Sequence, residues 1–352
     1  MDGIDAAVVA IGKNKIKLIA TQEKKISASL TQKLHNLIRT QQTTLANLSN
    51  CDAQLGFEFS QAVNELLKKA HLEAKDIKVI GSHGQTIYHH GQEDEHHRRN
   101  TMQIGSAPII AANTGINVVS NFRQLDMAYG GQGAPLAPII HQKLFAKKHK
   151  NTAVINLGGI ANVSFIGKDY ATAVGYDTGP ANCLLDEWIS IHHQQKYDDK
   201  GHWARSGTCN KILLAHMLND EYFQKPAPKS TGREYFNRHW YAQFKPEFKK
   251  TSAKDVQATL CHLTAQSIAI AIKKHNNIDE IIICGGGSKN TYLIELIAQY
   301  SHLPCEIAEN SDCIEAILFA YLAYLRIKNK KTKLYAITGS RKKVLIGDIC
   351  ET

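Results

Sequence analysis

A run of glycines after an apolar segment is the first pattern in this chain that could do chemistry. Residues 281–284 (Ile-Ile-Ile-Cys) lead into Gly285, Gly286, Gly287 and Ser288, and a helical pattern follows. Glycines at the carboxyl end of a strand let a ligand approach the backbone closely, and the N–H groups of the next helix suit a nucleotide phosphate. A tight turn without a ligand fits the same residues, so both interpretations stay open.

Asp177 is the best candidate for a catalytic carboxylate. It lies between Gly175 and Gly179, where a predicted strand gives way to a predicted helix. A carboxylate flanked by glycines is accessible to a substrate and could accept a proton from water or from a hydroxyl group. Aspartate is also strongly favoured as a helix N-cap. The residues alone do not separate these two roles.

Three more charged residues could contact a substrate. Arg123 and Asp126 precede a glycine-rich turn at residues 130–133. An arginine offers a planar fork to an anionic or hydroxylated substrate, although the two residues could equally form a surface ion pair. Glu315 lies near the start of the last predicted helix, where the helix dipole favours a carboxylate without any ligand.

Residues 89–99 combine four histidines with three acidic residues. Such a composition suggests a metal site. However, the segment lacks a histidine pair at positions i and i+4 of a helix and shows no other familiar ligand spacing. We therefore expect an exposed connection and assign no metal ligands.

The elements that must position these residues alternate along the chain. Apolar segments at 4–11, 16–20, 77–80, 117–120, 153–157, 161–166, 279–284 and 305–308 predict strands. Helical periodicity occupies much of the sequence between them and continues from 312 to about 327. This alternation predicts an α/β protein with mixed or parallel sheets. An apolar hairpin opens each half, which indicates a duplicated architecture.

Composition and charge exclude several classes of protein. The chain has 352 residues and a formal net charge of +10. Its basic residues are spread along the chain without interleaved aromatic residues, so we expect a solvated surface and no nucleic-acid partner. A basic protein also suits an anionic substrate. The chain has no G-x-x-x-x-G-K-[ST] motif and no G-x-G-x-x-G after its first strand, which disfavours P-loop NTPases and Rossmann dehydrogenases.

The eight cysteines and the N-terminal segment predict the compartment. No two cysteines have C-x-x-C spacing, and their scatter through apolar segments is typical of free thiols in a reducing environment. The first residues do not resemble a signal peptide, and no apolar run reaches the roughly 18 residues that a membrane span needs. We expect a cytoplasmic protein with no membrane partner.

Six motifs, taken in order, resemble those of the anhydro-N-acetylmuramic acid kinase family. They are 81–86 (Gly-Ser-His-Gly-Gln-Thr), 130–135 (Gly-Gly-Gln-Gly-Ala-Pro), 156–162 (Asn-Leu-Gly-Gly-Ile-Ala-Asn), 175–180 (Gly-Tyr-Asp-Thr-Gly-Pro), 228–234 (Pro-Lys-Ser-Thr-Gly-Arg-Glu) and 284–290 (Cys-Gly-Gly-Gly-Ser-Lys-Asn). Each motif is weak by itself, but six in the same order over essentially the whole chain are highly specific.

The resemblance implies the two-lobed fold of the acetate and sugar kinase, Hsp70 and actin superfamily. Each lobe would be a mixed sheet flanked by helices, with a cleft between the lobes. We expect residues 1–135 to form the N-terminal lobe and residues 136–352 the C-terminal lobe, with the last segment returning to the first. The family also implies a homodimer.

The same resemblance implies a reaction. The family uses ATP and Mg²⁺ to open 1,6-anhydro-N-acetylmuramic acid with water and to phosphorylate O6, which yields N-acetylmuramic acid 6-phosphate and ADP in peptidoglycan recycling. By resemblance, Asp177 activates the water, whereas Glu315 and Arg123 contact the sugar. ATP would contact two sets of residues: Met1, Asp2, Gly3, Ile4 and Asp5, and Gly285, Gly286, Gly287 and Ser288. Another kinase or hydrolase of the same superfamily is an alternative hypothesis.

The N-terminus departs from the family pattern. The family carries a strand and a Ser-Gly-Thr-Ser phosphate loop before Asp-Gly-x-Asp, and only the last part is matched here, by residues 2–5. We expect the true start to lie upstream of Met1. The alternative is a truncated, catalytically dead sugar-binding protein of the same fold. Loss of a central strand would expose unpaired sheet edges.

Overall fold

The computed structural model describes residues 3–12, 15–227, 229–275 and 277–352. The chain divides into two compact units. One combines the described residues up to Ile140 with Cys313–Thr352, and the other is His141–Asp312. Each unit contains sheets and helices, so the predicted α/β class is confirmed.

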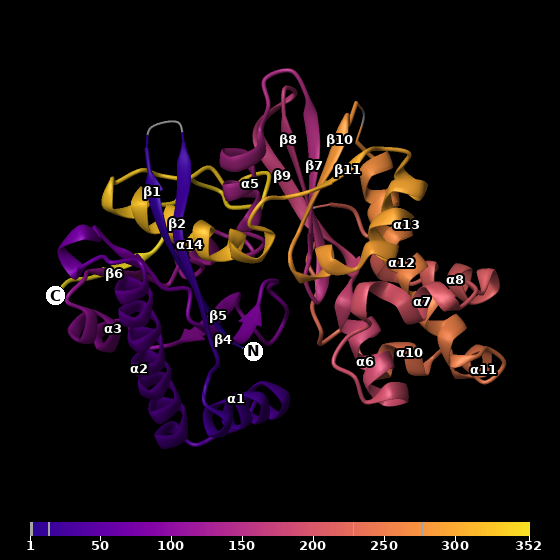
Figure 1. Cartoon of the computed structure of the whole chain (residues 1–352), viewed down its shortest axis with the longest axis horizontal. Helices are drawn as coiled ribbons and strands as arrows, with labels where there is room; N and C mark the ends of the chain where they lie inside the picture. Colours follow the sequence, from indigo (N-terminus) through magenta and orange to yellow (C-terminus); the bar gives the residue numbers. More distant parts are fainter. Residues whose placement is uncertain (1–2, 13–14, 228, 276) are drawn as a thin grey trace. The chain divides into compact units, whose positions relative to one another are not determined.

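The first unit contains a hairpin, a small sheet and several helices (Figure 1). Its strands are β1 (Ile4–Ile11), β2 (Ile16–Lys24), β3 (Ile80–Gly81), β4 (Gln85–His90), β5 (Asn100–Ile104), β6 (Val118–Ser120) and β12 (Asp348–Cys350). Its helices are α1 (Ala28–Thr40), α2 (Leu45–Lys69), η1 (Ala74–Asp76), α3 (Ala107–Thr114), α4 (Gln124–Ala128) and α14 (Ile314–Ile327), and α5 (Ala137–Phe145) contains the residue at which the units divide.

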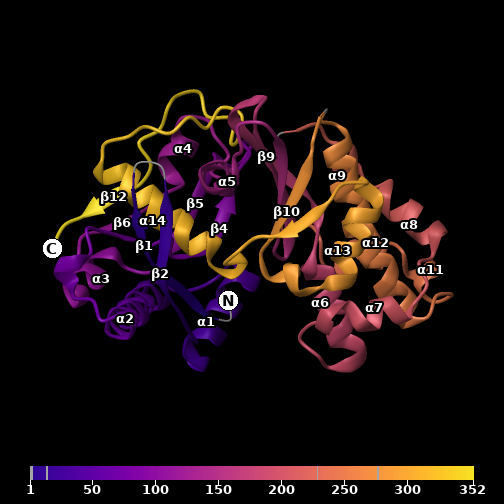
Figure 2. The same cartoon turned by 45° about the horizontal axis from the view of Figure 1, so that its top comes forward.

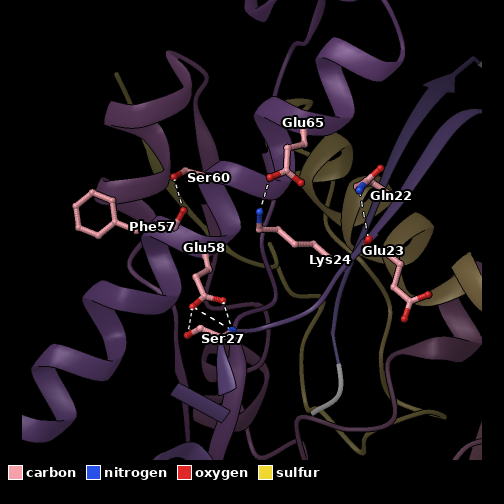
Figure 3. A network of polar contacts seen from close by, with 8 residues as sticks. All are labelled: Gln22, Glu23, Lys24, Ser27, Phe57, Glu58, Ser60 and Glu65. Carbon is pink, nitrogen blue, oxygen red and sulfur yellow. Dashed lines mark hydrogen bonds and ion pairs between the residues drawn. The ribbon is translucent and has the colours of Figure 1, made fainter. Parts of the chain in front are cut away.

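The β1–β2 hairpin is anchored to α2 by polar contacts at its far end (Figure 3). Lys24 forms an ion pair with Glu65 of α2. Just beyond β2, Glu58 accepts a hydrogen bond from the Ser27 hydroxyl at 2.6 Å and another from the Ser27 backbone N–H at 3.1 Å. These contacts hold the end of the hairpin against the helix, so β1 keeps a defined place in the unit.

A cavity of about 1080 Å³ lies in the first unit between β1 and the segment around β3. Its walls include two consecutive runs of chain, residues 3–11 and 76–86, together with apolar side chains of α2 and α14. Among the described residues, β1 pairs only with β2, and β3 pairs only with β6. We call this space the β1–β3 cavity.

The second unit is built on one five-stranded sheet of order β11-β10-β7-β8-β9. Its strands are β7 (Asn151–Leu157), β8 (Ile160–Gly167), β9 (Tyr170–Pro180), β10 (Glu280–Cys284) and β11 (Cys305–Ile307). β7, β8 and β9 are antiparallel neighbours, whereas β10 is parallel to both β7 and β11. The sheet is therefore mixed, and the predicted hairpin at the start of each half of the chain is confirmed by β1–β2 and β7–β8.

The helices of this unit are α6 (Asn182–His193), η2 (Asp199–Gly201), α7 (His202–Ser206), α8 (Lys211–Leu218), α9 (Glu221–Gln224), α10 (Arg238–Ala242), α11 (Lys245–Phe248), α12 (Ala253–Lys273), η3 (Gly286–Lys289), α13 (Thr291–Ser301) and η4 (Ser311–Cys313), the last ending at the unit boundary. Several of them pack against the sheet or against α12, which itself contacts β8 and β9. α12 and α13 lie side by side in both views (Figures 1 and 2). Fully buried side chains from β7, β8, β10 and α12 form one continuous core.

Glu280 is a buried charge at the start of β10. It accepts hydrogen bonds from Lys147 at 2.6 Å, Lys150 at 2.7 Å and the Thr152 hydroxyl at 3.0 Å. Burial alone would raise the pKa of this carboxyl, but the three hydrogen bonds outweigh it and lower the pKa to about 2. The ionised Glu280 therefore ties the start of β10 to the segment that enters β7.

Replacing Glu280 by glutamine should lower the free energy of unfolding by about 1.5–3 kcal/mol at pH 7, because hydrogen bonds to a charged group are lost. The folded-state pKa is depressed, so this stabilisation is complete above the ordinary glutamate pKa of 4.5 and is lost as the pH falls from there towards about 2. Urea unfolding at several pH values should show the difference from wild type shrinking across that window. Glu306→Gln, at an exposed position of neighbouring β11, is the control; equal effects of the two variants would contradict the expectation.

The sequence predicted free cysteines and no membrane-spanning segment. All eight cysteines are free thiols; four are buried and four are partly buried. Within the described ranges, no helix combines the length and apolar character needed to cross a membrane.

Candidate functional site

Asp177 lies in β9, three residues before the strand ends. Its side chain is buried, and its Oδ2 accepts hydrogen bonds from the Ser230 hydroxyl at 2.9 Å and the Thr231 backbone N–H at 3.0 Å. The backbone N–H of Asp177 donates to the Lys229 carbonyl at 3.0 Å. Two motifs that are about 50 residues apart in the sequence therefore meet at this carboxylate.

The alternative role of Asp177 as an N-cap is wrong. The next helix, α6, has Ala181 at its N-cap position, and the N–H groups of residues 181–183 donate to the carbonyls of Gly158 and Gly159. The first turn of α6 is thus satisfied by the β7–β8 turn and makes no use of Asp177.

A second layer of contacts fixes the backbone around Asp177. The Tyr222 hydroxyl donates to the Asp177 carbonyl at 2.8 Å, and the Lys229 ammonium donates to the Tyr222 carbonyl at 2.8 Å. Burial, with nearby Lys274 and Lys225, lowers the pKa of Lys229 to about 8, although Asp177 opposes that shift. The loop that holds the carboxylate is therefore itself held by buried polar contacts, which is how a preorganised catalytic group is supported.

The predicted glycine turn follows β10 and packs against the end of β7. Gly285 has φ +80°, and a Cβ there would lie 2.4 Å from Asn156 Oδ1. A Cβ on Gly287 would lie 2.7 Å from the Leu157 side chain. Glycine is required at both positions by backbone conformation or close packing.

Gly286 is different from its two neighbours. A Cβ built there would meet no described atom within 4 Å beyond the adjacent residues, and its φ is not in the left-handed region. Ser288, next along the turn, is buried, and its hydroxyl lies 3.3 Å from that of Ser311. The middle of the turn therefore offers open backbone that a ligand could approach.

Arg123 belongs to the first unit and makes two directed contacts. Its Nε donates to His83 Nε2 at 3.0 Å, and its Nη1 donates to the Gly133 carbonyl at 2.6 Å. His83 stacks on Phe319 of α14 at 4.4 Å, and burial together with the Arg123 charge holds the pKa of His83 well below its usual value. His83 is therefore a neutral acceptor that orients the guanidinium.

The alternative that placed Arg123 and Asp126 in an ion pair at the surface is wrong about the location of Asp126, which is completely buried. Its carboxylate accepts hydrogen bonds from the Gly133 N–H and from the Thr338 hydroxyl, both at 2.8 Å. Burial raises the pKa of Asp126, and these hydrogen bonds oppose the rise. Asp126 thus shapes the 130–133 turn that Arg123 also contacts.

Glu315 lies in the first turn of α14, and its side chain is exposed to the β1–β3 cavity. Protein surrounds it on its other sides, so burial raises the pKa of the carboxyl. Asp5 raises that pKa further, and Arg123 opposes the rise. The three charges therefore influence one another within the first unit.

The predicted nucleotide residues at the start of the chain are only partly described. Gly3, Ile4 and Asp5 lie at the start of the β1 hairpin and line the β1–β3 cavity with His83 and Glu315. Met1 and Asp2 lie outside the described residues. The first unit thus gathers residues 3–5, Arg123 and Glu315, whereas Asp177 and the 285–288 turn belong to the second unit.

The model of the anhydro-N-acetylmuramic acid kinase family matches residues 1–352 of the chain. The chain belongs to that family. Among curated members of the anhydro-N-acetylmuramic acid kinase family, the protein from Sulfurovum sp. (strain NBC37-1) is 42% identical over 99% of this chain and 96% of its own length. The Vibrio cholerae member is 41% identical over 99% of this chain and 95% of its own length.

A solved structure also aligns with most of the chain. Component A of (R)-2-hydroxyglutaryl-CoA dehydratase from Acidaminococcus fermentans covers 92% of this chain and 99% of its own, with 11% sequence identity and a TM-score of 0.47.

Sequence reasoning missed the residues that hold the predicted side chains. Ser230 and Thr231 stood in a motif without any assigned role, as did His83. The presence of short polar residues in glycine-containing motifs was the one available signal. Their contacts span 40–54 residues of sequence, so no local pattern could reveal them.

Proposed function

We propose that this kinase uses ATP to open 1,6-anhydro-N-acetylmuramic acid with water and to phosphorylate O6, releasing N-acetylmuramic acid 6-phosphate and ADP. The observation that carries the proposal is the family match across the chain, with relatives about 40% identical whose names specify this sugar. The buried Asp177 carboxylate, held by the 229–231 segment, supplies the base that such a reaction needs.

The chemistry of the anhydro sugar explains why a base is required. Its O6 is bonded to the anomeric carbon, so no free O6 hydroxyl exists to accept a phosphoryl group. Asp177 takes one proton from a water molecule as the water oxygen bonds to the anomeric carbon and the bond from that carbon to O6 breaks. The electron pair of the broken bond stays on O6, which then bonds to the γ-phosphorus of ATP while ADP leaves.

Glu315 and Arg123 hold the sugar in this proposal. Arg123 is oriented by His83 and by the Gly133 carbonyl, so little side-chain entropy remains to be lost when it contacts a substrate oxygen. Glu315 faces the β1–β3 cavity and, when ionised, can accept hydrogen bonds from sugar hydroxyl groups.

The nucleotide is assigned to the two glycine-containing segments. Gly286 offers unobstructed backbone in the turn after β10, which suits close approach of a nucleotide. Asp5 is an exposed carboxylate near the start of β1, and its hard oxygen atoms fit Mg²⁺ directly or through water. When bound, magnesium would neutralise charge on the phosphates.

Sugar-dependent release of ADP tests the proposal directly. The full chain is incubated with ATP, Mg²⁺ and the anhydro sugar in water enriched in oxygen-18, and the product is examined by mass spectrometry. One labelled oxygen should enter the sugar, and the phosphate ester should contain none. N-acetylmuramic acid without the internal bridge is the control substrate. Absence of sugar-dependent ADP, or label in the phosphate, would contradict the proposal.

Replacing Gly286 by alanine should weaken ATP binding by about tenfold without lowering thermal stability. The added methyl group meets open space in the protein and would intrude only on a bound nucleotide. The matched variant is Gly287→Ala, whose methyl would clash with Leu157 and should lower stability. Calorimetry with ATP and thermal melting separate the two effects; unchanged ATP affinity in Gly286→Ala would remove this turn from the nucleotide site.

The cellular setting follows from the proposed substrate. An enzyme that consumes ATP and a product of cell-wall turnover belongs in the cytoplasm, and the free cysteines fit a reducing compartment. A homodimer, a boundary between lobes near residue 135, and the absence of nucleic-acid partners are part of the same proposal.

A further inference from the structure

The turn that joins β4 to β5 brings together two histidines and an aspartate. One ligand atom from each of His90, Asp94 and His97 lies within 4.8 Å of the others. His90 Nε2 is 3.3 Å from Asp94 Oδ2, and His97 Nδ1 is 3.2 Å from Asp94 Oδ1. A helical template could not predict this group, because the hairpin places residues 90 and 97 near each other across a loop.

Local structure already fixes the middle member of the group. Asp94 Oδ1 accepts hydrogen bonds from the backbone N–H groups of His96 at 2.8 Å and His97 at 2.7 Å, and the Asp94 N–H donates to the His97 carbonyl at 3.1 Å. These bonds form a compact turn. They leave Oδ2 on the side of the carboxylate that faces His90.

His90 supplies the second indication of a ligand. It ends β4, where it is paired with Asn100 of β5, so its backbone is held by the hairpin. Its Nε2 atom is enclosed by protein and makes no hydrogen bond among the described residues, although Asp94 Oδ2 lies 3.3 Å away. An enclosed ring nitrogen without a hydrogen bond is costly unless something else binds it.

We propose that His90, Asp94 and His97 bind one divalent transition-metal ion of the zinc class. Two imidazole nitrogens and one carboxylate oxygen are a ligand set that suits Zn²⁺, Co²⁺ or Ni²⁺ better than the all-oxygen preference of Mg²⁺. Asp94 and His97 are exposed, so their side chains can rotate to bring the ligand atoms from within 4.8 Å to the separation that bonds of roughly 2.0–2.2 Å require. The fourth position is left to water.

The ion would act on the hairpin and not on the phosphoryl transfer. It would join the end of β4 to the loop and so stiffen the connection to β5. The adjacent residue His89 packs beside Gly133, whose carbonyl accepts a hydrogen bond from Arg123. Metal binding would therefore order a loop next to the segment that positions Arg123.

Metal titration of the full chain tests the proposal. The protein is stripped with a chelator, and Zn²⁺ is titrated against a chromophoric competitor at pH 7.5 in excess Mg²⁺. Co²⁺ is used in parallel for its visible absorption. His97→Ala and Asp94→Asn remove ligands, whereas His96→Ala removes an exposed neighbouring histidine that lies outside the group.

One equivalent of Zn²⁺ should bind the wild-type chain and the His96→Ala variant with the same affinity. His97→Ala and Asp94→Asn should weaken binding by more than about tenfold, since even an indirect partner of a metal ligand is worth 10–100-fold. Addition of Zn²⁺ should slow hydrogen exchange at residues 91–99 in the wild type. It should not slow exchange there in His97→Ala. Equal affinities of wild type and His97→Ala, or no saturable equivalent, would overturn the proposal. Because His97 is exposed, thermal melting should confirm that its variant folds.

Discussion

Asp177→Asn should reduce turnover of the anhydro sugar by about 10²–10⁴-fold, which is the usual contribution of a general base. The amide has nearly the same shape and can still accept hydrogen bonds from Ser230 and Thr231 through its oxygen. It cannot accept the proton of the attacking water. ATP affinity should stay unchanged, because the nucleotide is assigned to other segments. Initial rates of sugar-dependent ADP release and calorimetry with ATP measure the two quantities.

The matched control is Asp199→Asn, which removes an exposed carboxylate from the same unit. This variant should retain wild-type turnover and stability. If Asp177→Asn turned over at the wild-type rate while melting normally, Asp177 would not be the base. If it failed to fold, Ser230→Ala offers a second test, since weaker positioning of the same carboxylate should lower kcat without changing the KM for ATP.

Arg123→Met should raise the KM for the sugar by about 10–150-fold, with little change in the KM for ATP. The range corresponds to the roughly 1.5–3 kcal/mol of a hydrogen bond that involves a charged group. The guanidinium is held by His83 and the Gly133 carbonyl, so the substitution removes a preoriented cation. Steady-state kinetics with each substrate varied in turn would reveal the split.

A pH profile distinguishes substrate binding from a merely structural role of Arg123. Arg123 opposes the rise in the pKa of Glu315, so its loss should raise that pKa further. The acid limb of kcat/KM for the sugar should then move to higher pH in Arg123→Met, because ionised Glu315 would be lost sooner on acidification. Arg39→Met, which replaces an exposed residue of α1, should change neither the KM values nor the profile. An unshifted limb with an unchanged KM would remove Arg123 from the sugar site.

The features that could be predicted from the sequence lie in strands or directly next to them. The β1–β2 and β7–β8 hairpins, and the strand that leads into Gly285, were visible because long apolar runs are bounded by glycine or polar turns. Asp177 was visible for a similar reason, since its flanking glycines stand where a predicted strand gives way to a predicted helix. Its assignment as the base remains a prediction.

Features that depend on contacts distant in sequence could not be predicted. The sequence left Asp126 open between a substrate contact and a surface ion pair. Neither interpretation included its complete burial with a hydrogen bond from Thr338, more than 200 residues later. Strands β4 and β5 were not predicted, because β4 ends in two histidines and leads into a polar segment, whereas the exposed connection expected at 89–99 is confirmed for residues 91–99. In each case a tertiary partner outweighed the local pattern.

The β1–β3 cavity has a consequence for the handling of this protein. The described strands on its two sides each have a ladder partner on one edge only, and backbone amides on a free edge can recruit an extended segment from another molecule. Insertion of such a segment would also bury the apolar side chains of α2 and α14 that line the same space, and this burial is favourable. An extended segment of one molecule could therefore add to these strand edges in another molecule. We expect concentrated samples to form oligomers through this face.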